Sequence, residues 1–265
     1  MSDSVVLPAQ PSRGIAGGVH VHLPTLPEAL ASLLRTVVVA LFVITFLLQP
    51  FLIPSESMER TLLVGDFLLF NKQVYAPAGP VGKWLMPYRS IRRGDIIVFH
   101  HPRPSLLVKR VIGVPGDLLR IQNGKVYVNG VLLDEPYAAY EPAPPNDFRD
   151  NFPPRIYSDP QVDPDWWREM QSLTHNGELR VPAGEYFVLG DNRNHSNDSR
   201  YWGLVPRQAV VARPLVIYFS LRRPSTTDVQ PAPLQAADDK LGHDRDFSVR
   251  LADFARWKRI FRVIH

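Results

Sequence analysis

The chain of 265 residues contains no cysteine. This absence excludes disulfide scaffolds, thiolate zinc sites, iron–sulfur clusters and cysteine nucleophiles together, and it leaves the redox compartment open. The excess of positive charge is small, at +4, so the composition does not indicate a nucleic-acid-binding surface. Long helices are disfavoured because 26 prolines interrupt the chain. A composition that is 45% hydrophobic therefore predicts a globular protein of loops and short strands around a real core.

One segment near the N-terminus is long and apolar. No residue from Thr36 to Ser55 carries a charge. At about 1.5 Å per residue, a helix of this length spans about 30 Å, the thickness of the hydrocarbon core of a bilayer. A buried core helix and a cleaved signal peptide are the alternatives, but a signal peptide needs a small-x-small cleavage site, which the following QPFLIPSES lacks. We therefore expect one retained transmembrane helix over residues 29–54.

The residues before this segment indicate its orientation. Residues 1–28 are rich in proline, glycine and small polar residues, and we expect them to form a flexible tail. Arg13 and Arg35 give this side a weak positive-inside signal. Basic residues in a long domain beyond the span do not count against it, because the rule applies only to short loops. The tail is therefore predicted to be cytoplasmic, and residues 56–265 are predicted to lie across the membrane.

Short apolar runs with alternating character follow the apolar segment. They cover residues 67–75, 95–101, 106–114, 119–133, 185–190 and 214–220. Asn-Gly pairs at 123–124 and 129–130 lie beside such runs and are strong signals for β-hairpins. The predicted fold class is mainly β, with an antiparallel β-sheet domain formed by residues 55–123 and 185–221.

Three segments differ in composition from this β-domain. Residues 124–184 are acidic and rich in proline, and they are predicted to form an inserted small subdomain. Residues 222–247 are polar and are predicted to be a linker. Residues 248–265 place apolar residues at helical spacing with arginines on the other side, which predicts a basic amphipathic helix. Such a helix either lies on an anionic membrane surface or packs on its own domain.

A serine and a lysine form a candidate catalytic pair. Ser57 closely follows the apolar segment, and Lys109 lies within the apolar run 106–112. Leu107 and Val111 flank Lys109 on its own strand face, so its amine is expected to point into apolar surroundings. Burial lowers the pKa of a lysine amine, and a serine hydroxyl needs such a base to act as a nucleophile. An ordinary lysine on an edge strand is the alternative.

Four sequence blocks extend this pair. They are IPSESM with the following TL and GD (53–66), RGDIIVF (93–99), VKRVIGVPGD (108–117) and GDNRNHSNDSRYWG (190–203). In this order they resemble the blocks of bacterial type I signal peptidases, also called leader peptidases. The resemblance covers residues 50–135 and 183–220. It implies a membrane-bound serine endopeptidase that uses a Ser–Lys dyad to remove signal peptides from exported preproteins after small residues.

The resemblance also assigns roles within the site. It implies that Ser57 is the nucleophile and Lys109 the general base. It implies that the Ser55 hydroxyl and the Ser57 backbone N–H stabilise the oxyanion, and that the Ser196 hydroxyl orients the lysine. Such donors must lie near the developing charge, and the base must be held in one orientation.

Two further groups of residues are carried over from the family pattern. Asp198 and Arg200 match a supporting ion pair near the site, with a structural rather than a catalytic role. The positions that match the lining of the substrate pockets are Phe51, Ile53, Leu62 and Val108.

The sequence departs from the family pattern close to the nucleophile. Glu56 stands where the family commonly has a small residue, and Arg60 replaces its usual proline. Both place charge beside Ser57 and are candidates for altering substrate preference. His195, with Asp191 or Asp198, offers an alternative Ser–His–Asp arrangement, but Lys109 already supplies a base.

The resemblance implies no cofactor and no metal, and His100-His101 lacks a third ligand at suitable spacing. The expected partners are signal-peptide-bearing preproteins, the lipid bilayer and, as a further candidate, the protein-export machinery, with no nucleic acid. The expected location is the bacterial inner membrane, with a single span and the catalytic domain on the extracytoplasmic side. Two alternatives stay open: a soluble, self-cleaving Ser–Lys protease, and a membrane-anchored β-domain without activity.

Overall fold

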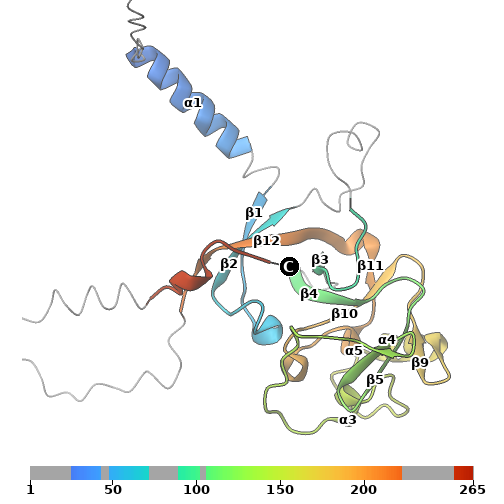
Figure 1. Cartoon of the computed structure of the whole chain (residues 1–265). Coiled ribbons are helices and arrows are strands. Elements are labelled where there is room, and N and C mark those ends of the chain that lie inside the picture. The colour runs from blue at the N-terminus through green and yellow to red at the C-terminus, as the bar shows by residue number, and fades with distance from the viewer. Residues whose placement is uncertain (1–24, 43–47, 72–88, 102–105, 223–253, 265) are drawn as a thin grey trace, which may run out of the picture. The chain divides into compact units, whose positions relative to one another are not determined.

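The computed structural model describes residues 25–42, 48–71, 89–101, 106–222 and 254–264 (Figure 1). The chain divides into two units, Met1–Leu41 and Phe42–His265. Helix α1 (Leu26–Phe42) ends at the boundary between these units and follows Thr25, whose backbone N–H donates to Glu28 Oε2 at 2.9 Å. This contact satisfies one of the free amides at the start of a helix.

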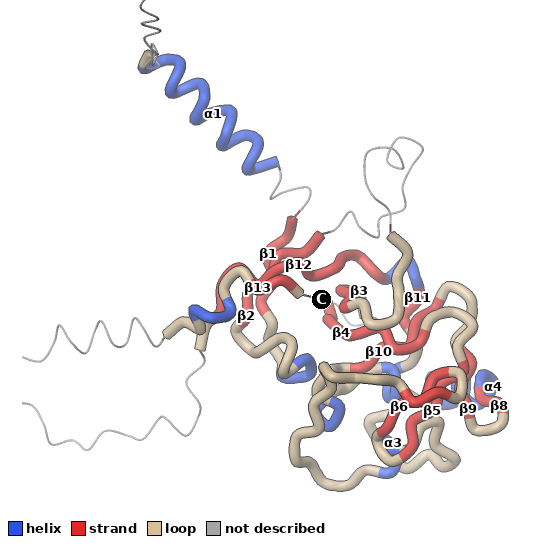
Figure 2. Tube along the Cα trace, viewed as in Figure 1, coloured by secondary structure: helices blue, strands red, loops and turns tan. Residues whose placement is uncertain are grey.

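The second unit contains an antiparallel sheet of eight strands in its described part (Figure 2). The strand order is β1-β2-β12-β3-β4-β10-β11, and β13 pairs with β12. The strands are β1 (Leu48–Leu52), β2 (Asp66–Asn71), β3 (Ile96–His100), β4 (Leu106–Gly113), β10 (Glu185–Leu189), β11 (Val205–Pro206), β12 (Val210–Ser220) and β13 (Arg262–Val263). The predicted fold class, mainly β and antiparallel, is confirmed.

A second, five-stranded sheet carries most of the predicted insertion. Its order is β7-β6-β5-β9-β8, and its strands are β7 (Val131–Leu132), β6 (Lys125–Val128), β5 (Leu118–Gln122), β9 (Glu178–Arg180) and β8 (Thr174–His175). Helix α4 (Pro164–Leu173) buries Trp166 and Met170 in one core with Leu119 and Leu179 of this sheet. The predicted boundary at residue 124 is therefore misplaced, because it separates β5 from its hairpin partner β6.

Short helical elements fill the connections. They are 3-10 turns η2 (Glu56–Met58), η3 (Arg193–His195), η4 (Arg207–Ala209) and η5 (Trp257–Arg259), and α-helices α3 (Asp147–Asp150) and α5 (Ser199–Trp202).

The eight-stranded sheet curls strongly. Strands β1 and β4 are separated in the sheet order by β2, β12 and β3, yet Phe51 of β1 and Leu106 of β4 line the same cavity. In a flat sheet, four spacings of about 4.8 Å would hold these strands about 19 Å apart. Irregular pairing in β12 contributes to the curl because bulges increase strand twist. It occurs between Pro214 and Val216 and between Ile217 and Phe219 opposite β2, and between Val210 and Ala212 opposite β3.

The predicted membrane-spanning helix over residues 29–54 is wrong at its C-terminal end. Residues 43–47 lie outside the described residues, and Leu48–Leu52 form β1 rather than helix. Pro50 explains the change, because proline removes a helical hydrogen bond and is tolerated in an edge strand such as β1. Among the described helices, none combines the length and apolar character needed to cross a bilayer.

The predicted basic helix at the C-terminus is also wrong where it is described. Residues 254–264 form η5 and the short strand β13, which pairs with β12. Arg259 is buried against Asp66, with Nη2 and Oδ2 2.5 Å apart, and Phe261 has a φ of 62°. The left-handed residue ends the helical turn, and the buried ion pair fixes the segment to the sheet. The predicted linker and residues 248–253 lie outside the described part, apart from Arg222 at the linker's start.

Candidate active site

Ser57 is placed by the chain segment that leaves β1. Ser55 has an extended backbone, and the chain then makes the single turn η2, which carries Ser57. Met58 is 1% exposed and packs with Ile53 in the apolar core of the curled sheet, so the turn is anchored on both sides of Ser57. Ser57 itself is 8% exposed.

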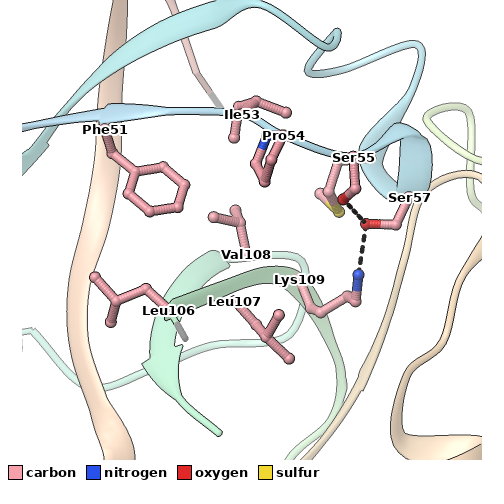
Figure 3. A pocket seen from close by; sticks show the side chains of 10 residues that line it. Phe51, Ile53, Pro54, Ser55, Ser57, Leu106, Leu107, Val108 and Lys109 are labelled. Atoms are coloured by element: carbon pink, nitrogen blue, oxygen red, sulfur yellow. Dashed lines mark hydrogen bonds between the residues drawn. The ribbon is translucent and has the colours of Figure 1, made fainter. Parts of the chain in front are cut away.

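Lys109 reaches Ser57 from β4. The residues of β4 from Val108 to Gly113 are all buried, and Lys109 is 4% exposed. Its Nζ lies 2.5 Å from Ser57 Oγ and hydrogen-bonds to it (Figure 3). The pKa of Lys109 is lowered to about 8, mainly by burial; the Arg200 charge acts in the same direction, and the Asp198 and Asp191 carboxylates oppose the shift. About a tenth of the amine is therefore neutral at pH 7, far more than for an ordinary lysine, and the fraction rises steeply as the pH approaches 8.

The two other predicted serines lie on either side of Ser57. Ser55 Oγ is 3.4 Å from Ser57 Oγ, and either hydroxyl can donate. Ser196 is buried, but within the described residues no hydrogen bond joins its hydroxyl to Lys109. Ser196 and the Ser57 carbonyl both pack against Gly190, where an added Cβ would lie 2.2 Å from Ser196 Oγ and 2.4 Å from Ser57 O. The site therefore has no space for a side chain at residue 190.

Asp198 and Arg200 form the predicted ion pair. The Arg200 guanidinium donates to both carboxylate oxygens of Asp198 at 2.8 Å, and both side chains are fully buried. Burial opposes the charge on Asp198, but Arg200 and the Gly190 N–H, which donates at 3.1 Å, hold the pKa of this carboxyl below its usual range. The pair thus places a fixed carboxylate close to the Lys109 amine.

A second buried ion pair was missed by sequence reasoning. Arg110 follows Lys109 on β4 and donates to both oxygens of Asp191, at 2.8 and 2.7 Å. Thr61 Oγ1 donates to the same carboxylate at 2.5 Å. The two residues lie in the third and fourth sequence blocks, but a pair far apart in sequence becomes visible only when the sheet brings the blocks together.

A small cavity opens beside the Ser57–Lys109 contact (Figure 3). Its volume is about 40 Å³, and its lining consists of Phe51, Ile53, Pro54, Ser55, Ser57, Met58, Leu106, Leu107, Val108 and Lys109. Phe51, Ile53 and Val108 are therefore at the cavity as predicted. Leu62 is not part of the lining, because it is fully buried in the core behind it. Met58, Leu106 and Leu107 line the cavity and were missed.

The residues that depart from the family pattern lie at the surface. Glu56 and Arg60 are exposed, and Arg60 donates to the Ala138 carbonyl at 3.0 Å. His195 is exposed, and its Nε2 lies 3.3 Å from the Pro142 carbonyl rather than on Ser57. The arrangement therefore offers Lys109, not His195, as the base.

A serine hydroxyl hydrogen-bonded to a buried amine, beside a small cavity, is an arrangement in which the serine can be activated as a nucleophile. Residues 26–219 match the family described as signal peptidase, peptidase S26, and the chain belongs to this family. The predicted family and the predicted enzyme class, a serine peptidase, are confirmed.

The similar proteins carry the same description. Signal peptidase I of Pseudomonas aeruginosa is 34% identical over 224 residues, which are 78% of this chain and 77% of that protein. Signal peptidase I of Leptolyngbya laminosa is 36% identical over 84% of this chain and 93% of its own length. A crystal structure of a signal peptidase I from Enterococcus faecalis is 33% identical, covers 47% of this chain and 97% of that chain, and has a TM-score of 0.36.

Proposed function

We propose that this protein is a membrane-bound endopeptidase that removes N-terminal signal peptides from exported preproteins, with Ser57 as nucleophile and Lys109 as general base. The observation that carries the proposal is the 2.5 Å hydrogen bond between Lys109 Nζ and Ser57 Oγ in a buried, apolar setting. The names of the relatives support the substrate class.

The reaction begins with the neutral amine of Lys109. It accepts the proton of Ser57 as Oγ attacks the scissile carbonyl carbon, and a tetrahedral intermediate forms. The Ser55 hydroxyl and the Ser57 backbone N–H are the proposed donors to its oxyanion. The Lys109 ammonium then gives its proton to the leaving amine, and the C–N bond breaks. A water molecule hydrolyses the acyl-enzyme in the same way, with Lys109 again accepting the proton.

The cavity and the free edge of β4 explain how a substrate would be held. Among the described residues, β3 pairs with Leu106–Arg110 of β4, whereas β10 pairs with β4 only from Arg110 onward. The opposite edge of β4 near Val108 can therefore accept an extended peptide as an added strand. A cavity of about 40 Å³ beside the nucleophile suits a small side chain.

The proposal includes attachment to the bacterial inner membrane with the catalytic unit on the extracytoplasmic side. The apolar run that precedes the nucleophile supports it. Enzyme and substrate would then share one bilayer, and their effective concentration would be high enough for recognition of only a few small side chains.

The test uses the full chain in phospholipid vesicles with a preprotein that has alanine at the first and third positions before the cut. We expect Ser57→Ala and Lys109→Met each to lower kcat at least ~10³-fold, because each removes a reacting group. Lys125→Met, at an exposed lysine of β6, is the matched control and should retain full activity. Cleavage by the Lys109→Met variant at the normal rate would disprove the dyad. A self-cleaving protease would cut itself and leave the preprotein intact, and a domain without activity would cut neither.

A further inference from the structure

A segment of the insertion crosses the loop that packs against Ser57. We call residues 135–142 the strap, and residues 190–196 the site loop. Backbone hydrogen bonds join the two where Ala139 N donates to Asp191 O at 2.7 Å and Arg193 N donates to Ala139 O at 2.8 Å. The strap is thus paired with the site loop through the main chain.

One buried ion pair reinforces this pairing. Glu135 of the strap accepts two hydrogen bonds from the Arg193 guanidinium, one of them from Nη1 at 2.8 Å. The two side chains are only 6% and 3% exposed. Arg193 Nε also donates to Gly190 O at 3.2 Å, so the arginine held by Glu135 stabilises the turn of the site loop itself. Buried charges that are paired in this way have one preferred geometry.

The site loop in turn contacts the nucleophile. Asn192 N donates to the Ser57 carbonyl at 3.1 Å, and Gly190 lies directly against the same carbonyl. Ser57 is therefore held between the site loop on its backbone side and Lys109 on its hydroxyl side.

The strap also reaches β4. The Tyr137 ring lies under the Arg110 guanidinium, 3.9 Å from the ring centroid, and the Tyr137 hydroxyl donates to Glu135 Oε1 at 3.1 Å. Arg110 is the neighbour of Lys109 and the partner of Asp191. Glu135 is therefore connected to both elements that carry the proposed dyad.

We propose that Glu135 is a positioning residue: through Arg193 and the strap it holds the site loop against Ser57, and so maintains the contact between Ser57 and Lys109. This inference rests on the proposed function. It gives the acidic insertion a role in setting the geometry of the site, beyond any contact with partners.

The test replaces Glu135 by glutamine in the full chain, in vesicles, with the alanine-containing preprotein. We expect kcat to fall at least ~10-fold with KM changed less than ~2-fold, because the nucleophile is misplaced while the substrate cavity is intact. The groups that act on Lys109 are the carboxylates of Asp191 and Asp198 and the guanidinium of Arg200, and its burial is the largest influence. A loosened site loop admits water, so the acid limb of the kcat/KM profile should move to higher pH.

The matched control is Glu178→Gln, the same change in a half-exposed ion pair with Arg120 in the same insertion. It should leave kcat and the pH profile unchanged. If Glu135 acts through Arg193, the double variant Glu135→Gln/Arg193→Gln should lose no more activity than Arg193→Gln alone. If Glu135→Gln does not fold, Glu135→Asp keeps the charge and should show the same changes to a smaller degree.

The outcomes separate this inference from the proposed function. If the wild-type chain cleaves, Ser57→Ala does not, and Glu135→Gln keeps the wild-type kcat and acid limb, then only the positioning role is wrong. A loss of folded protein in Glu135→Gln and Glu135→Asp, with an unchanged kcat for the folded fraction, would also overturn it. If the wild-type chain does not cleave the preprotein, the proposed function itself fails.

Discussion

Lys109 is the residue whose titration governs the proposed chemistry. Burial lowers the pKa of its amine to about 8, and only the neutral amine accepts a proton from Ser57. We expect kcat/KM to rise with pH as the amine loses its proton and to be half-maximal near pH 8. A pH profile measured with the full chain checks this. An acid limb below pH 6 would contradict it.

The same residue makes the stability of the fold depend on pH. In the native state the Lys109 amine is neutral above about pH 8, whereas an unfolded lysine keeps its proton to about 10.5. Between these values the unfolded state binds more protons, so the contribution of Lys109 to the free energy of unfolding rises with pH. Denaturant titrations from pH 7.5 to 10 should show a smaller rise for Lys109→Met than for Lys125→Met. Equal rises in the two variants would contradict this.

Gly190 is a position where geometry leaves no alternative to glycine. An added Cβ would meet Ser196 Oγ at 2.2 Å and Ser57 O at 2.4 Å, inside the contact distances of real atoms. We expect Gly190→Ala to displace the site loop and to lower kcat at least ~10²-fold. Gly177→Ala is the control: it has open space but a φ of 78°, so it should cost about 1–2 kcal/mol of stability and leave kcat unchanged. Preprotein cleavage and thermal unfolding of both variants measure the difference.

At the scale of the element, β4 carries the proposed base and also lines the proposed substrate cavity. Val108 precedes Lys109 and lines the cavity, which measures about 40 Å³. We expect Val108→Ala to enlarge it and to raise the relative rate for a preprotein with valine before the cut. Val128→Ala makes the same change in the core of the five-stranded sheet and should leave the preference unaltered. Competition between alanine and valine substrates measures this, and an unchanged ratio in Val108→Ala would refute the assignment of the cavity.

The C-terminal segment is an element whose attachment depends on charge. Arg259 donates to both oxygens of Asp66, which is completely buried. Without Arg259 the buried carboxylate keeps, within the described residues, only the more distant charge of Arg256, 3.9 Å away, and hydrogen bonds from Ser220 and the Leu63 N–H, so Arg259→Met should lower the free energy of unfolding by about 3 kcal/mol. Arg262→Met, at an exposed position of β13, should change it by less than ~0.5 kcal/mol. Chemical denaturation of both variants measures the two free energies of unfolding, and equal values would contradict the prediction.

The sequence predicts these elements to different degrees. The apolar alternation around Lys109 is a local signal, and it correctly indicates a buried strand. The contact between Lys109 and Ser57 was predicted from chemistry and family resemblance, because no local pattern encodes a pairing across 52 residues. The C-terminal end of the predicted span and the predicted C-terminal helix were mispredicted for one reason: apolar content and helical spacing are compatible with a strand packed in the sheet as well as with a helix. The Glu135–Arg193 pair is tertiary and left no sequence signal.

At the scale of the whole molecule, the proposed attachment to the membrane has a direct test. We expect the full chain to remain with the membrane fraction after an alkaline carbonate wash, because the sequence is apolar and carries no charge from Thr36 to the start of β1 at Leu48. Replacing Val38 and Leu41 of α1, both exposed on that helix, by arginine should release it, since charge at the centre of a span costs about 2.5–3.5 kcal/mol per residue. Release of the wild-type chain by the wash would contradict the proposal.

The strand order of the curled sheet has a consequence for the growing chain. Strand β12 lies between β2, on the side of Ser57, and β3, on the side of Lys109. Of the strands β1, β2, β12, β3 and β4, it is the last in the sequence. A ribosome that has completed residue 209 has already made every reacting group, but the strand that joins the two halves of the site does not yet exist. The proposed nucleophile and base are thus synthesised before the strand that completes the sheet between them.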